Sequence, residues 1–288
     1  MSQTSSLKRA LSSQIILVTG ATSGVGAVTA LELARLGATV VLAGRNEDRC
    51  QETVESILVK TGNEAVDYLI ADLSSQSDIR RLAAEFQSRY RRLDVLVNNA
   101  GAYFFRRQES IDGLEMTLAL NHLSYFLLTN LLLDTLQASA PARVVNVSSS
   151  AHYGNPIDFD DLGSQKNYGL MKVYGRSKFA NILFTYELAR RMAGTGVTAN
   201  ALHPGFVRTN IARNNGWYMH LVMPLVLTRA ISPEEGARTS IYLASSPDVI
   251  DVTGKFFIKC QETPSDPATY NEDDAQRLWE ISAALTNL

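Results

Sequence analysis

Short apolar runs alternate along the chain with longer segments in which apolar residues recur every three or four positions. A continuous apolar run of about five residues is typical of a strand buried on both faces, and the wider spacing is typical of a helix with one apolar side. Segments of the first kind predict strands at residues 15–20, 39–44, 65–73, 93–101, 143–149, 197–205 and 253–260.

The helical spacing falls between these strands. It predicts a first helix that stops at Gly37, a helix that starts near Tyr174, and helices over residues 47–60, 78–90, 112–137, 233–244 and 273–284. Strict alternation of strand and helix predicts an α/β fold, a Rossmann-like doubly wound parallel sheet of about seven strands with helices on both faces. No repeat or low-complexity linker divides the chain. We therefore predict one domain over residues 1–288, of which 1–13 form a flexible polar N-terminus.

Composition excludes several classes of protein. The 288 residues are 45% hydrophobic with a formal net charge of −2, which fits a globular protein and does not suggest a nucleic-acid partner. Two cysteines cannot form a disulfide framework, and the four histidines lack metal-ligand spacing. No run reaches the ~20 apolar residues of a membrane span; the nearest, residues 217–230, is interrupted by His220 and Pro224. We predict a cytoplasmic protein without a transmembrane segment or a metal.

The segment TGATSGVG, residues 19–26, joins the first strand to the first helix. Glycines let a backbone approach a phosphate closely, and the helix start then offers free N–H groups and a positive dipole end. The spacing G-x-x-x-G-x-G differs from the standard G-x-G-x-x-G, and a tight turn without a ligand is the alternative. We expect the dinucleotide cofactor to contact Gly20, Thr22, Ser23, Gly24, Val25 and Gly26.

The end of the second strand selects between the two nicotinamide cofactors, because an acid there binds the free ribose of NAD and an arginine accommodates the 2′-phosphate of NADP. This chain has Arg45 and Asn46 there, and no acid before Glu47. Arg45 can form a charge-assisted contact with the phosphate, to which the Ser23 hydroxyl can add. The alternative is a solvated surface arginine. We predict NADP(H).

Several motifs together resemble the short-chain dehydrogenase/reductase family along nearly the whole chain. They are TGATSGVG, ADL at 71–73, NNAG at 98–101, Asn121, NVSS at 146–149, YGRSK at 174–178 and HPGFVRT at 203–209. The stretches RVVNVSSSAHYG, YGRSKFANILFTYELARR, GVTANALHPG and QRLWEIS are most similar to the retinol dehydrogenase branch. Members of that branch often carry an N-terminal membrane anchor, and we expect none here.

The stretch NYGLMKVYGRSKFAN contains Tyr-x-x-x-Lys twice, as Tyr168 with Lys172 and Tyr174 with Lys178. Residues four apart are neighbours on a helix, so the lysine charge is expected to lower the tyrosine pKa and fit the phenol for proton transfer. On one helix the two tyrosines would point about 240° apart. We choose Tyr174, since it opens the amphipathic helix and Ser177 precedes its lysine. Tyr168 is then a loop aromatic or part of the substrate mouth.

The resemblance implies the rest of the catalytic set. Ser149 would hydrogen-bond the substrate oxygen beside Tyr174, with Ser148 and Ser150 as the alternatives. Asn121 would hold a water that links the lysine to solvent, unless it bonds only a neighbouring backbone group.

The resemblance also implies further cofactor contacts. Asp72 and Leu73 would lie by the adenine, and Asn98 would stabilise the sheet. His203 would be structural in its turn. The remaining expected contacts, along the cofactor and around the nicotinamide, are Asn99, Ala100, Gly101, Pro204, Gly205, Val207 and Thr209.

These elements predict hydride transfer between NADP(H) and a small apolar carbonyl or alcohol. Residues 210–230 are rich in large apolar side chains and are expected to cover the substrate; a core or oligomer helix, or shallow membrane contact, are the alternatives. Compared with many members of the family, the chain has additional residues near 153–166. They would form a surface loop that obstructs the helix pairing between two chains, so both a monomer and a homodimer remain open. An NADP-binding sensor or scaffold, or a reductase of sterol, polyketide or xenobiotic ketones, are the competing functions.

Overall fold

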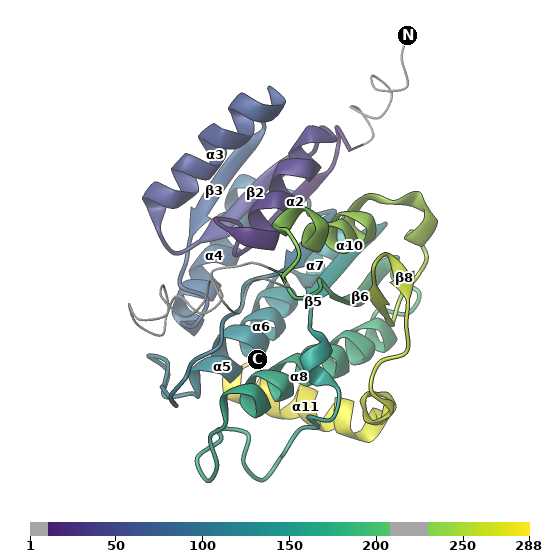
Figure 1. Cartoon of the computed structure of the whole chain (residues 1–288). Coiled ribbons are helices and arrows are strands. Elements are labelled where there is room, and N and C mark those ends of the chain that lie inside the picture. The colour runs from purple at the N-terminus through teal and green to yellow at the C-terminus, as the bar shows by residue number, and fades with distance from the viewer. Residues whose placement is uncertain (1–10, 208–229) are drawn as a thin grey trace.

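The computed structural model describes residues 11–207 and 230–288, which build one eight-stranded sheet (Figure 1). The strand order is β3-β2-β1-β4-β5-β6-β7-β8, and every pairing is parallel except that of β7 with β8. The strands are β1 (Ile15–Thr19), β2 (Thr39–Gly44), β3 (Val66–Ile70), β4 (Val95–Asn98), β5 (Ala142–Val147), β6 (Val197–His203), β7 (Lys255–Ile258) and β8 (Gln261–Glu262).

Helices cover both faces of this sheet, as predicted. The main ones are α2 (Gly24–Arg35), α3 (Glu47–Thr61), α4 (Gln76–Arg89), α5 (Met116–Leu118), α6 (Ser124–Leu131), α7 (Leu133–Ala138), α8 (Leu170–Arg191), α10 (Pro233–Ser245) and α11 (Glu272–Thr286). No helix in the described part of the chain combines the length and apolar character needed to cross a membrane.

Two apolar cores lie on opposite faces of the sheet because successive strand side chains point to opposite sides. On β1, Leu17 enters the core shared with α4, α6, α8 and α11, whereas Ile16 and Val18 enter the core shared with α2, α3 and α10. Leu11, which the sequence placed in the polar N-terminus, is also buried in the second core, and its N–H donates to the Leu36 carbonyl. Leu11 is therefore part of the packed structure.

The eighth strand is a difference from the predicted seven. β8 pairs antiparallel with β7 through a two-residue turn of Lys259 and Cys260, whose φ angles are 52° and 62°. Such hairpin turns need positive φ and usually contain glycine or asparagine. Because neither residue is of that kind, the sequence carried no signal for the turn.

The helix predicted over 112–137 is a second difference, since it begins later and is interrupted. α5 starts at Met116 and is followed by a π-helical turn, η1 (Ala119–Leu123), before α6. The Glu115 carboxylate caps α5 by accepting two of its backbone N–H groups at 2.9 and 2.7 Å. Single π turns inside helices often mark functional positions, and this one contains Asn121.

Candidate active site

The glycine loop lies between β1 and α2 and is packed against the end of β4. Gly20 has a φ of +63°, and a Cβ at Gly26 would come within 2.4 Å of both the Asn99 side-chain nitrogen and the Gly20 carbonyl oxygen. The Asn99 amide donates to the carbonyls of Thr19 at 2.8 Å and Gly20 at 3.3 Å. Asn99, expected at the cofactor, therefore braces the loop that would hold it.

The first turn of α2 is open for an anion. Ser23 is the N-cap residue, its side chain makes no capping hydrogen bond, and it is exposed. Around it Thr22 and Gly24 are partly exposed, and Val25 is buried against Val207. A twelve-residue helix whose first N–H groups lack intrahelical partners presents donors and a positive dipole end. These residues fit a dinucleotide pyrophosphate.

The end of β2 places Arg45 and Asn46 on the surface beside that loop. Asn46 caps α3, because its side-chain oxygen accepts the Arg49 N–H at 2.9 Å. Glu47, the first acid, lies within 3.5 Å of the Tyr68 hydroxyl. The residue that directly follows the strand is therefore a cation, as the sequence indicated.

Asp72 and Leu73 follow β3. The Asp72 carboxylate accepts the Ser74 N–H and hydroxyl at 2.9 and 2.7 Å, and Leu73 is buried in the core. Asp72 thus forms a local turn, which shapes the end of the strand.

A buried polar network links the centre of the sheet to the helices, and it extends beyond the one residue the sequence indicated, Asn98. The Asn98 amide donates to Asn146 on the neighbouring strand at 2.9 Å and to Thr129 on α6 at 3.0 Å. The Asn146 amide donates in turn to Thr185 on α8 at 3.0 Å. Asn98 and Asn146 are register partners in β4 and β5. These side-chain hydrogen bonds link α6 and α8 to the ends of β4 and β5.

Three of the four predicted catalytic side chains meet beyond the carboxyl end of β5. Ser149 follows that strand, and Tyr174 on α8 lies close enough for the Ser149 side chain to lower its pKa. Lys178, one turn further along α8, is buried, and its Nζ donates to the Val147 carbonyl at 2.9 Å. The same Nζ lies 5.7 Å from the centre of the Tyr174 ring and 5.5 Å from that of Tyr125.

The expected lowering of the tyrosine pKa by the lysine does not occur in the protein alone. Burial raises the pKa of Tyr174 to about 12, Ser149 opposes this through its hydrogen bond, and the neighbouring Tyr103 adds to it. Burial also lowers the pKa of Lys178 to about 7. Both shifts have the same cause, since an apolar surrounding disfavours the charged form of each group.

The neighbouring serines occupy different environments from Ser149. The Ser148 hydroxyl is buried and donates to the Lys178 carbonyl at 2.7 Å, so it anchors β5 to α8. Ser150 is exposed at the start of the one-turn helix η2 (Ser150–His152). Of the three, Ser149 is the one placed against Tyr174.

Asn121 makes the backbone contacts that the sequence kept as an alternative. Its amide donates to the Ala102 carbonyl at 2.9 Å and to the Ser177 hydroxyl at 3.0 Å, and its oxygen accepts the Ala102 N–H at 2.9 Å. A Cβ at Gly101 would stand 3.2 Å from the Asn121 oxygen and 3.4 Å from the Lys178 Nζ. Asn121 and Lys178 therefore face each other across Gly101.

Tyr168 precedes α8 instead of lying on it. Its hydroxyl donates to the Phe104 carbonyl at 2.6 Å. The ring that faces Tyr174 is that of Tyr103, which meets it edge-on at 5.7 Å. The two Tyr-x-x-x-Lys pairs thus lie in different environments, and of the two tyrosines Tyr174 is the one whose pKa the Ser149 side chain lowers.

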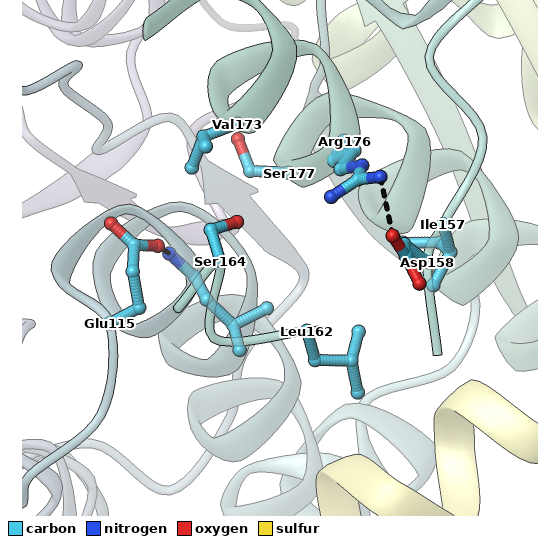
Figure 2. A pocket seen from close by; sticks show the side chains of 9 residues that line it. Glu115, Ile157, Asp158, Leu162, Ser164, Val173, Arg176 and Ser177 are labelled. Atoms are coloured by element: carbon cyan, nitrogen blue, oxygen red, sulfur yellow. Dashed lines mark hydrogen bonds and ion pairs between the residues drawn. The ribbon is translucent and has the colours of Figure 1, made fainter. Parts of the chain in front are cut away.

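A small pocket lies on another side of α8 (Figure 2). Val173, Arg176 and Ser177 line it from the helix, with Glu115 opposite and Asp158 paired to Arg176 at 2.9 Å. Its volume of about 20 Å³ has room for about one water. It is therefore too small to be the substrate site.

The segment after β6 borders the same edge of the sheet. Gly205 has a φ of +96°, and a Cβ there would lie 2.5 Å from the Ile231 Cδ1. Val207 is buried and forms an isolated bridge with Ile231, and Pro204 is partly exposed. Thr209 and residues 210–229 of the predicted covering segment 210–230 lie outside the described residues.

Metal-ligand geometry is absent from residues 11–207 and 230–288, where no group of three His, Cys, Asp or Glu could hold an ion. Burial lowers the pKa of His122 and of His203 to about 4. His122 shares a hydrogen bond of 2.9 Å with the Ser282 hydroxyl. These histidines are neutral structural residues near pH 7.

A doubly wound sheet with a glycine loop, and a serine, tyrosine and lysine at its carboxyl edge, defines an oxidoreductase that binds a nicotinamide cofactor. Residues 14–217 match the family model of short chain dehydrogenases. The chain belongs to that family, in its retinol dehydrogenase-like branch.

Individual relatives agree with this. The chain is 42% identical over 287 residues to human retinol dehydrogenase 13, covering 98% of this chain and 87% of that one. It is 40% identical over 282 residues to human polyprenol dehydrogenase, covering 96% and 86%. Among solved structures, the RhlG/NADP active-site complex from Pseudomonas aeruginosa superposes with a TM-score of 0.69 at 30% identity, covering 87% of this chain and 96% of that one.

Proposed function

We propose that the protein interconverts an apolar aldehyde or ketone and its alcohol with NADP(H), working mainly as a reductase. The observation that carries the proposal is the grouping of Ser149, Tyr174 and the buried Lys178 beyond the carboxyl end of β5, at the edge of the sheet that also holds the glycine loop. In reduction a hydride adds to the carbonyl carbon and a proton to its oxygen. The bound cofactor supplies the hydride.

Each catalytic side chain has a separate role in the proposed reduction. Ser149 orients the carbonyl oxygen, and Tyr174 donates the proton to it. The raised pKa of Tyr174 keeps the phenol protonated at neutral pH, which is the state that reduction requires. The pKa of Lys178 is lowered to about 7, so its ammonium group exchanges protons readily near neutral pH. It can therefore return a proton to Tyr174 after Tyr174 has donated its own. Asn121 bonds Ser177, the residue before Lys178, and the Ala102 backbone.

The preference for NADP over NAD rests on Arg45. It stands directly after β2, where a 2′-phosphate would lie, and the nearest acid, Glu47, belongs to the first turn of α3. The relative from Pseudomonas aeruginosa is described in complex with NADP. Initial rates with NADPH and NADH, compared as kcat/KM, test the preference, and equal values would reject it.

The proposed apolar substrate is supported by the aromatic side chains around Tyr174. The Tyr103 ring meets Tyr174 at 5.7 Å and Phe105 at 6.1 Å, both edge-on. Tyr168 is fixed to the Phe104 carbonyl in the same loop. The names of two relatives, retinol dehydrogenase and polyprenol dehydrogenase, denote apolar alcohols. We propose residues 210–230 as the covering segment of this site.

The experiment follows NADPH absorbance with a panel of apolar aldehydes and ketones, retinal and a polyprenal included. Wild type is compared with Tyr174→Phe and with Tyr168→Phe, which removes the hydroxyl of the other Tyr-x-x-x-Lys pair. The proposal expects turnover by wild type and Tyr168→Phe and none by Tyr174→Phe. NADPH that is bound but never consumed would favour the sensor or scaffold function, and preference for sterol or polyketide ketones would redefine the substrate.

The cytoplasmic location and the oligomeric state, monomer or homodimer, belong to the same proposal. Fractionation of cells tests the first, and light scattering of the purified protein measures the second.

A further inference from the structure

The turn that carries Ser149 is held from behind by His152. The Ser149 carbonyl accepts the His152 backbone N–H at 3.2 Å and its ring Nδ1–H at 2.6 Å. The other ring nitrogen, Nε2, accepts the backbone N–H of Asp266 at 3.1 Å. His152 has an exposed fraction of 0%, so water does not compete for these bonds.

These partners define one state of the ring. A carbonyl only accepts and a backbone N–H only donates, so His152 is a neutral imidazole with its hydrogen on Nδ1. Burial lowers the pKa of His152 and favours the same state. The ring packs on Tyr153 at 3.9 Å and against the edge of Phe256 on β7 at 5.0 Å. His152 is therefore a rigid spacer between the Ser149 carbonyl and the Asp266 amide.

The front of the turn rests directly on α8. A Cβ at Gly175 would lie 2.5 Å from the Ala151 carbonyl oxygen, so the absence of a side chain lets the turn approach the helix. Gly175 is the residue after Tyr174, whose pKa the Ser149 side chain lowers. A small shift of the turn would therefore change the distance between the Ser149 and Tyr174 hydroxyls.

The far end of the link is anchored to the same helix. Asp266 caps the one-turn helix η6 (Pro267–Tyr270), with its carboxylate accepting the Ala268 N–H at 2.9 Å. The adjacent Ser265 hydroxyl hydrogen-bonds the Tyr186 hydroxyl of α8 at 2.7 Å. The C-terminal segment thus connects α8 to the Ser149 turn through His152.

We propose that His152 is a positioning residue of the active site, which sets the place of the Ser149 hydroxyl against Tyr174 by linking the Ser149 carbonyl to the Asp266 amide. The inference rests on the proposed reductase function and deepens it. His152 acts through Ser149 and needs no contact with the substrate. It also makes the segment after β8 part of the catalytic architecture.

Three substitutions separate the two ends of the link. His152→Phe keeps an aromatic ring and removes both hydrogen bonds, His152→Asn retains a donor near Nδ1, and His152→Gln retains an acceptor near Nε2. Tyr153→Phe is the matched control, because it removes only the 2.6 Å bond from the Tyr153 hydroxyl to the Pro264 carbonyl, between the same two segments. For each variant, kcat and both KM values are measured with the best wild-type substrate. Thermal unfolding and NADPH binding verify folding.

His152→Phe is expected to lose about 10- to 100-fold in kcat, as a misplacement of about 1 Å can cost, with KM for NADPH within about twofold of wild type. His152→Asn should recover part of kcat, since the Ser149 end of the link remains, and Tyr153→Phe should match wild type. A purely structural role would lower Tm in all of them and leave kcat per folded molecule unchanged.

The outcomes are separable. A folded His152→Phe with wild-type kcat would overturn the inference, and so would an equal loss in Tyr153→Phe. If His152→Phe fails to fold, the comparison of His152→Asn with His152→Gln decides, because equal kcat values in these two would also overturn it. A wild type that reduces none of the carbonyls would instead reject the proposed function itself.

Discussion

Replacement of Lys178 with methionine should abolish turnover and yet stabilise the fold at neutral pH. The side chain is 2% exposed, and burial lowers its pKa from 10.5 to about 7. The folded protein thus binds fewer protons than the unfolded chain between these values. The resulting cost to folding is absent above pH 10.5, grows as the pH falls, and is complete below about pH 7.

The size of the effect follows from this range. Each pH unit adds about 1.4 kcal/mol, so the cost reaches about 5 kcal/mol at pH 7. Methionine removes that cost, but it also removes the 2.9 Å bond from Nζ to the Val147 carbonyl and the contact of Nζ with the Tyr125 ring at 5.5 Å. These are worth about 1–3 kcal/mol together. We expect Lys178→Met to gain about 2–4 kcal/mol in the free energy of unfolding at pH 7.

Urea unfolding of the cofactor-free protein, followed by circular dichroism at about pH 7, 8 and 9, measures this gain. The advantage of Lys178→Met over wild type should shrink by about 1.4 kcal/mol with each pH unit. Lys172→Met is the control, since Lys172 is exposed in the first turn of the same helix, and it should change stability by less than about 0.5 kcal/mol. A Lys178→Met protein that is less stable than wild type by the same amount at every pH would refute the reasoning.

Three further predictions concern other parts of the chain. Arg45→Ala should raise KM for NADPH by about 10- to 100-fold, because a charge-assisted contact is lost, and leave KM for NADH nearly unchanged; an equal rise for both would contradict this. Gly26→Ala places a Cβ 2.4 Å from the Asn99 amide and the Gly20 carbonyl. The free energy of unfolding should therefore fall by about 1–3 kcal/mol, and NADPH should bind more weakly. Unchanged Tm and unchanged NADPH affinity would contradict this prediction. Burial lowers the pKa of His122 from 6.5 to about 4, so stability is lost as the pH falls through this range, and His122→Leu should reduce that loss by about 3 kcal/mol. Denaturant unfolding of wild type and His122→Leu at both ends of this pH range measures the loss of stability. An equal loss in the two proteins would contradict the prediction.

Much of the fold could be predicted from local pattern. The seven main strands are buried runs bounded by turns, and their observed bounds lie within the predicted segments, as for β2 over Thr39–Gly44, except that β5 begins one residue earlier, at Ala142. The π turn at Asn121 was missed because a hydrophobic repeat over the whole predicted helix cannot distinguish a regular helix from one widened at a single position. The hairpin at Lys259 was missed because its residues are unusual for positive φ.

At the site, the sequence alone identified the family and predicted Tyr174 as the catalytic tyrosine, because motif order and helical spacing are properties of the chain itself. Tertiary structure decided what each group experiences. Burial, which depends on residues far apart in the chain, lowers the pKa of Lys178 and raises that of Tyr174, opposite to the expectation from their spacing. The tertiary structure also brings His152 to the Asp266 amide, 114 positions away in the sequence. Spacing can place two side chains on one helix, but only packing sets their solvation and their distant partners.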